Sequence, residues 1–228
     1  MPFANHTPYD YFPRRLHPRE IGNPYLAIHQ FFDWENLPEW RNQLDKWLQA
    51  ALKSGFQLSR DELVELFVRY EFIEYLVEAL SLVHRLMDST YMPERELLLD
   101  MRKNSERLLP DEINTAHGYF NNNYQPKQFE REEYYPFHLD ADEKEYPHGV
   151  IRDFFDFQNL PQYRDALYWW HIVAIDFTNA DDSRGSNYVY NLHKHLMKVI
   201  EAAHLIHIRS ANGDENEIEK EPEKTPGL

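Results

Sequence analysis

Asp33 and Arg41 recur as Asp156 and Arg164, at the same spacing and in two stretches of the chain that are otherwise apolar. Each Asp precedes an expected helix and each Arg falls in its first turns, so the two side chains are placed to meet across the start of the helix. Paired charges beside buried surface are most often structural. We therefore expect two bracing ion pairs. The alternative is two pockets in which arginine binds an anion or a carboxylate through its bidentate fork.

The last expected helix carries a second group of residues with binding chemistry, Glu201, His204 and His207. Glu201 and His204 have the Glu-x-x-His spacing that places a carboxylate and an imidazole on one helical face, as in helical di-iron bundles. The matching place in the first half holds Glu78 followed by Ser81, so the second such motif is missing. No cofactor is predicted. In an alternative hypothesis, Glu78, Glu201, His204 and His207 bind iron or another divalent metal in a helical-bundle enzyme.

An acidic stripe of Glu71, Glu74 and Glu78 follows the helical repeat in the first half of the chain. At two of the three matching positions the second half has Lys194 and Met197. A stripe that tolerates lysine is typical of a solvated helix face, so we expect these carboxylates to face water.

Arg164 is followed by His171 after six intervening residues. This spacing is similar to the Arg-x4-6-His motif of the HEPN family of helical ribonucleases, and the resemblance covers eight residues. It implies a helical ribonuclease in which these two side chains act together, which is a second alternative function. At the position matching His171, the first half of the chain has Leu48.

The composition argues against several other classes of function. With 24 Lys and Arg against 39 Asp and Glu, the net charge of -15 would repel a phosphate backbone, so nucleic acid is not an expected partner. The absence of cysteine excludes disulfides, thiolate ligands and thiol nucleophiles. The sequence also has no glycine-rich phosphate loop, no Gly-x-Ser-x-Gly elbow and no His-Glu-x-x-His helix.

The segments expected to position these residues occur twice in the sequence. Residues 11–51 align without a gap on residues 134–174, an offset of 123, with sixteen identities where chance at about 6% per position gives roughly two or three. The identical positions in the first copy are Tyr11, Pro13, Leu16, Glu20, Pro24, Ile28, Phe31, Phe32, Asp33, Asn36, Leu37, Pro38, Arg41, Leu44, Trp47 and Ala51. The similarity is lost between Lys53 and Tyr75 and returns at the same offset, where Glu78 aligns with Glu201. A slip of three residues would instead pair His84 with His204.

Each copy opens with two aromatic residues and a proline, which favours an extended arm. A short helix is expected to begin at Pro24 and again at Pro147, because proline suits the first helical turn. These helices carry paired phenylalanines, at 31–32 and 154–155, which are core candidates.

Two longer helices follow in each copy. Asn36 and Asn159, each with Glu or Gln three residues later, form capping boxes that start a medium helix. Ser59 forms another capping box with the Glu three residues later, and it starts a long helix that runs to about Met87. The equivalent helix of the second copy is expected to end near Arg209.

The predicted fold is all-α, a pseudo-two-fold helical bundle built from a tandem duplication of a three-helix unit. A single domain spans residues 1–209, with repeat unit one at about 11–88 and repeat unit two at about 134–209. Between the units we expect inserted helices at about 93–120. Residues 210–228 are rich in charged residues and poor in large apolar groups, which predicts an acidic flexible tail.

Tyr168 and Trp169 are aromatic where the first half has Asp45 and Lys46, and His171 extends the same stretch. This asymmetric aromatic surface predicts a contact patch for a partner protein or a second copy. The most apolar run, residues 166–175, is too short to span a bilayer. We therefore expect a cytoplasmic, non-catalytic interaction or scaffolding module rather than an enzyme.

Overall fold

The computed structural model describes residues 6–52, 59–87, 131–175 and 183–211. The described residues are helical and contain no strand, which confirms the all-α prediction. The helices are α1 (Pro18–Gly22), α2 (Pro24–Trp34), α3 (Leu37–Leu52), α4 (Arg60–Met87), α6 (Ala141–Glu145), α7 (Pro147–Phe157), α8 (Leu160–Ile175) and α9 (Ser183–Ala211), with 3-10 turns η1 (Pro8–Tyr11) and η3 (Arg131–Tyr134). The inserted helices expected at 93–120 and the tail beyond residue 211 lie outside the described residues.

Most of the helix starts are those that the caps predict. Asn159 and Gln162 make the reciprocal pair, each backbone N–H donating to the other side chain at 2.9 and 3.0 Å. Asn36 accepts from the backbone N–H of Glu39 at 3.0 Å. The carboxylate of Glu39 accepts instead from Gln43 at 2.6 Å, so this predicted box is half formed.

The two arms are less extended than predicted. Each contains a short helix, α1 or α6, that begins at its own capping box. In α1 the backbone N–H of His17 donates to Glu20 at 2.7 Å, and in α6 that of Asp140 donates to Glu143 at 2.9 Å. The carboxylate is the third residue after the cap in both arms, so a local signal for these helices is present in the sequence.

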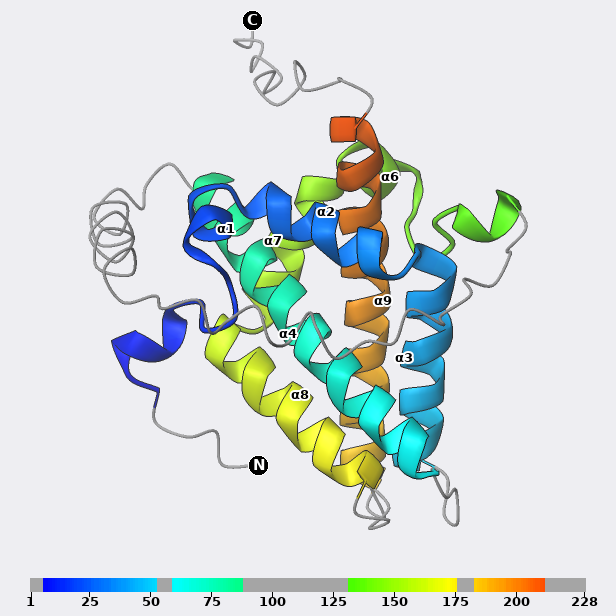
Figure 1. Cartoon of the computed structure of the whole chain (residues 1–228). Helices are drawn as coiled ribbons and strands as arrows, with labels where there is room; N and C mark the ends of the chain where they lie inside the picture. Colours follow the sequence, from blue (N-terminus) through cyan, green and yellow to red (C-terminus); the bar gives the residue numbers. More distant parts are fainter. Residues whose placement is uncertain (1–5, 53–58, 88–130, 176–182, 212–228) are drawn as a thin grey trace, which may run out of the picture.

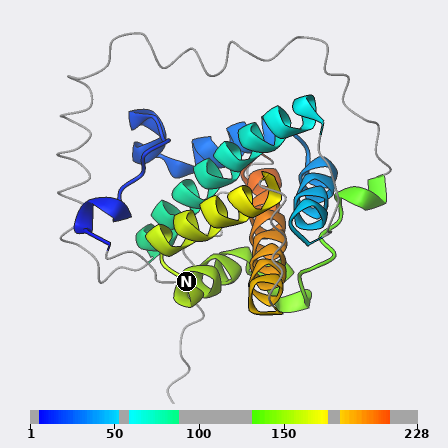
Figure 2. The same cartoon turned by 90° about the horizontal axis from the view of Figure 1, so that it is seen from below.

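The four longer helices form two crossed pairs. In Figure 1, α4 and α8 run side by side, and α9 stands behind them next to α3. Seen from below, the α4 and α8 pair lies across the ends of α3 and α9 (Figure 2). α3 also contacts α8. The shorter helices α2 and α7 each contact both α4 and α9. None of the described helices is long and apolar enough to cross a membrane.

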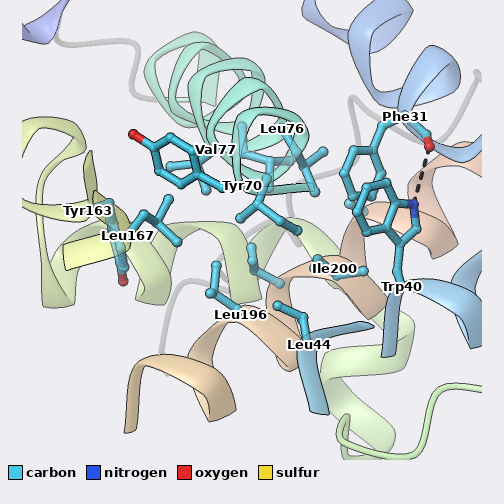
Figure 3. Packing of buried hydrophobic residues seen from close by; sticks show 14 of the residues in the cluster. Phe31, Trp40, Leu44, Tyr70, Leu76, Val77, Tyr163, Leu167, Leu196 and Ile200 are labelled. Carbon is cyan, nitrogen blue, oxygen red and sulfur yellow. Dashed lines mark hydrogen bonds between the residues drawn. The ribbon is translucent and has the colours of Figure 1, made fainter. Parts of the chain in front are cut away.

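Aromatic rings and aliphatic side chains together fill the core of this arrangement (Figure 3). Trp40 stacks on Phe31 with ring centroids 4.0 Å apart, and Tyr163 stacks on Phe154 at 3.9 Å. Trp40 and Tyr163 also donate a hydrogen bond to the backbone carbonyl of the phenylalanine on which each stacks, at 3.3 and 2.7 Å respectively. Each medium helix is thereby fixed against the short helix before it.

Candidate functional site

Arg164 lies at the centre of a buried polar cluster that joins α8, α4 and the first arm. Its guanidinium donates to the backbone carbonyls of Asp10 and Phe12 and forms an ion pair with Glu78. Nε lies 3.3 Å from the carboxylate of Glu74, which also binds Arg15 of the arm. We call these residues the Arg164 centre.

Arg41 forms a second cluster of the same design on α3, which we call the Arg41 centre. Its guanidinium donates to the backbone carbonyls of Glu133 and Tyr135, each at 2.6 Å, and pairs with Glu201 of α9 at 2.5 Å. The ring of Phe137 lies 4.6 Å from the guanidinium carbon and covers it. Each arginine therefore connects one half of the chain to the arm and long helix of the other half.

The carboxylates of the two centres also hold the arms directly. Glu78 accepts from the backbone N–H groups of Arg14 and Arg15 at 2.9 and 2.8 Å. Glu201 accepts from those of Phe137 and His138 at 3.1 and 2.8 Å. Both carboxylates are fully buried. A buried charge is tolerated only when it is paired and hydrogen bonded, and these two are.

The electrostatic balance can be followed at Glu201. Burial alone would raise its pKa, but the hydrogen bonds from His138 and the positive charge of Arg41 outweigh burial and lower it. The side chain of His138 lies 2.8 Å from this carboxylate and therefore contributes directly. Glu201 is thus held as an anion, and its oxygens are already shared among Arg41 and the arm.

Two expectations about these charges are wrong. Arg41 and Arg164 do not pair with Asp33 and Asp156, both of which are exposed, because the guanidinium groups point toward the opposite half of the chain. The acidic stripe is also not a solvated face. Glu74 and Glu78 are buried, because the arm lies over them and supplies Arg15 and two backbone N–H groups.

The histidines of the last helix form a separate cluster with α2. The Nδ1 atoms of His29 and His207 lie 2.7 Å apart, so one ring donates and the other accepts. His204 packs edge-on against Phe32, and burial together with neighbouring His207 and Arg41 lowers its pKa to about 4. Burial and the charge of His29 lower the pKa of His207 as well. The rings of His204 and His207 therefore favour their neutral forms near pH 7.

The proposed metal ligands are not assembled around one point. Glu78 belongs to the Arg164 centre and Glu201 to the Arg41 centre, whereas His204 and His207 contact α2. Within the described ranges, no group of three or more His, Asp or Glu residues could hold a metal ion. The HEPN-like pair is divided in a similar way, since Arg164 binds Glu78 while the His171 ring stacks on Tyr70 at 4.9 Å.

The predicted aromatic surface on α8 is only partly exposed to solvent. Tyr168 is exposed over 57% of its area, but Trp169 is half-buried and packs against Tyr188. His171 is buried. Beside these residues is a hollow of about 500 Å³, lined by Leu63, Phe67, His171, Ile172 and Ile175.

Two residues that the sequence prediction missed continue this surface on α4. Val64 is 56% exposed and Phe67 48% exposed, and the start of α4 meets the end of α8 at the lower edge of Figure 1. We call the set Leu63, Val64, Phe67, Tyr168, Ile172 and Ile175 the apolar face. Leu63, Val64 and Phe67 lie in the first turns of a helix that opens with charged residues, and this pattern is a sequence signal for the apolar face.

Comparison with known protein families, with curated proteins and with solved structures finds no match for this chain.

Proposed function

We propose that this chain is a non-catalytic protein-binding module, formed by tandem duplication of a three-helix unit and arranged about a pseudo-two-fold axis. The apolar face between α4 and α8 is the surface that receives the partner. The observation that carries the proposal is the exposure of Val64, Phe67 and Tyr168 on the two helices whose side chains line a hollow of about 500 Å³.

The contacts of the two arginine centres support the duplication. Arg41 and Arg164 are 123 residues apart, and so are their carboxylate partners Glu201 and Glu78. The carbonyls that they bind, and the N–H groups that the carboxylates accept, are separated by the same number. The offset of 123 is the same for every one of these pairs. A slip of three residues in the block around Glu78 would instead pair Glu78 with Lys198.

Contacts between residues at matching positions of the two halves support a two-fold axis. In such an arrangement only residues near the axis can touch their own equivalents. Trp47 stacks on Trp170, and the hydroxyl of Tyr25 lies 3.5 Å from Nε2 of His148. Both pairs differ by 123 in residue number. They would mark two points along the proposed axis.

A binding role is supported by how the two halves differ. The positions that match Val64, Phe67, Tyr168 and Ile172 hold Asn187, Tyr190, Asp45 and Gln49. The buried architecture is matched between the halves, while the surface on α9 and α3 that corresponds to the apolar face has polar residues at three of these four positions. Exposed apolar groups that gather beside a hollow are typical of an interaction site, since water contact with them is unfavourable.

Site-specific photo-crosslinking tests the proposal. A photoreactive phenylalanine is placed at position 168, and in a matched control at position 45, in cells that naturally contain the protein. We expect a discrete protein adduct from position 168 and none from position 45, with mass spectrometry identifying the adduct. Equal labelling from both positions, or no adduct from position 168, would refute the proposed binding face. Sedimentation of the purified protein distinguishes a different partner from a second copy.

A further inference from the structure

We infer that the apolar face binds an amphipathic helix whose apolar stripe is flanked by lysine and arginine. This inference rests on the proposed function and adds the chemistry of the partner. It combines two observations on the described residues, the shape of the face and the sign of the charge around it.

The shape fits one side of a helix. The hollow runs between two helices, with Leu63 and Phe67 on the α4 side and Ile172 and Ile175 on the α8 side. Grooves of this kind receive the apolar stripe of an amphipathic helix, whose side chains recur every three or four residues. Phe67 and Tyr168 are rings with large exposed areas, and such rings are enriched among the residues that dominate binding energy.

The charge around the face is acidic. Asp61, Glu62 and Glu65 are exposed in the first turns of α4, beside Arg60. Glu65 also pairs with Arg69 at 2.8 Å, and the charge of Lys46 acts on Glu62, so the excess of negative charge here is smaller than the number of carboxylates. Asp165 lies on α8, three residues before Tyr168, with 41% of its side chain exposed and its carboxylate 3.3 Å from Nε2 of His6. A basic helix would be attracted to this rim and to the net charge of -15.

The same charges disfavour the other occupants. An acidic helix would bring like charges together along α4. A second copy of this chain would do so as well, because its own apolar face carries the same acidic rim. Apolar contact alone does not distinguish these occupants, but the sign of the flanking charge does.

Fluorescence anisotropy with defined peptides tests the inference on the full chain. One labelled helical peptide, about five turns long, carries leucines on one face and lysines on the other. A second peptide has glutamates in place of the lysines. We expect the lysine peptide to bind about tenfold or more tightly than the glutamate peptide, with the difference shrinking as salt screens the charges.

A matched pair of variants locates the binding. Phe67→Ala should weaken the lysine peptide about tenfold, as removal of an anchoring ring does. Tyr190→Ala, at the matching position on α9 and with a similar exposure of 47%, should change binding less than about twofold. Both side chains are substantially exposed, so both variants are expected to fold.

The outcomes separate the two proposals. If both peptides bind equally and Phe67→Ala weakens both, the basic preference is wrong while the binding face stands. If Tyr190→Ala weakens binding as much as Phe67→Ala, or if no peptide binds, the helix-binding inference is overturned. In those cases the crosslink from position 168 decides the proposed function independently.

Discussion

Trp47 of α3 and Trp170 of α8 stack face to face, with ring centroids 4.2 Å apart and ring planes 12° from parallel. Both indoles are almost completely buried. The Nε1 atom of each is buried with no hydrogen-bond partner among the described residues. The stack therefore joins the two halves through ring contact and burial, and it leaves two polar N–H groups uncompensated.

Replacing one indole by a smaller ring should have a mild effect on stability. Trp47→Phe keeps an aromatic ring and removes an unpaired N–H, so we expect a loss of less than about 2 kcal/mol in the free energy of unfolding. Trp47→Ala opens a cavity and should cost about 3–5 kcal/mol. Urea titration measures both. Trp170→Phe should match Trp47→Phe within about 0.5 kcal/mol, and a loss from Trp47→Phe as large as that from Trp47→Ala would contradict this account.

Loss of either arginine should be strongly destabilising. Arg164→Met leaves the carboxylate of Glu78 buried without its cation, and the expected cost is about 3–5 kcal/mol of unfolding free energy. Arg41→Met should cost a similar amount through Glu201. Adding Glu78→Gln to Arg164→Met should restore part of the stability, since it removes the uncompensated charge.

Denaturant unfolding at neutral pH measures these arginine variants, with Asp33→Ala as the exposed control. That control should change the free energy of unfolding by less than about 0.5 kcal/mol. A cost below about 1 kcal/mol for Arg164→Met would show that the Arg164 centre does not hold the arm.

Acid should destabilise the protein through His204. Its folded pKa of about 4 lies below its usual value of 6.5, so the unfolded chain takes up this proton first as the pH falls. The contribution of His204 to the free energy of unfolding is fully present above pH 6.5, declines as the pH falls toward 4 and is lost below that. The total loss is roughly 3 kcal/mol. The groups that face the imidazole are His207, Arg41 and Glu201, in addition to the ring of Phe32.

The variant His204→Gln tests this pH dependence, because it cannot titrate. Its unfolding free energy should vary less between pH 6.5 and 4 than that of the unaltered protein. Acid loss from Glu201, whose folded pKa is lowered, should persist in the variant, because that group releases its stabilisation at lower pH. An unchanged slope between pH 6.5 and 4 would assign the acid sensitivity to other groups.

Removal of His29 should change the titration of its neighbour. His29 is one of the charges that lower the pKa of His207, after burial. We therefore expect His29→Gln to raise the pKa of His207, as followed by the imidazole chemical shifts in an NMR titration. A pKa of His207 that stays the same or falls would show that the contact between the two Nδ1 atoms does not govern its protonation.

The sequence alone determined the helical class and most helix boundaries. These features have local causes, because a cap such as Asn159 with Gln162 is satisfied within one turn and an apolar stripe needs only the helical period. The short helices α1 and α6 follow the same local rule at Glu20 and Glu143. Comparison of residues 11–51 with residues 134–174 marked Arg41 and Arg164 as charges present at matching positions.

Only the tertiary structure decided what those charges bind. Glu78 and Glu201 lie 86 and 160 residues from their arginine partners, so neither pair follows from local sequence spacing. Burial of the acidic stripe depends on an arm that folds back over it. The apolar face likewise forms because α4 and α8 pack side by side and bring Phe67 near Ile172. Side-chain partners across helices are fixed by packing, which no single segment encodes.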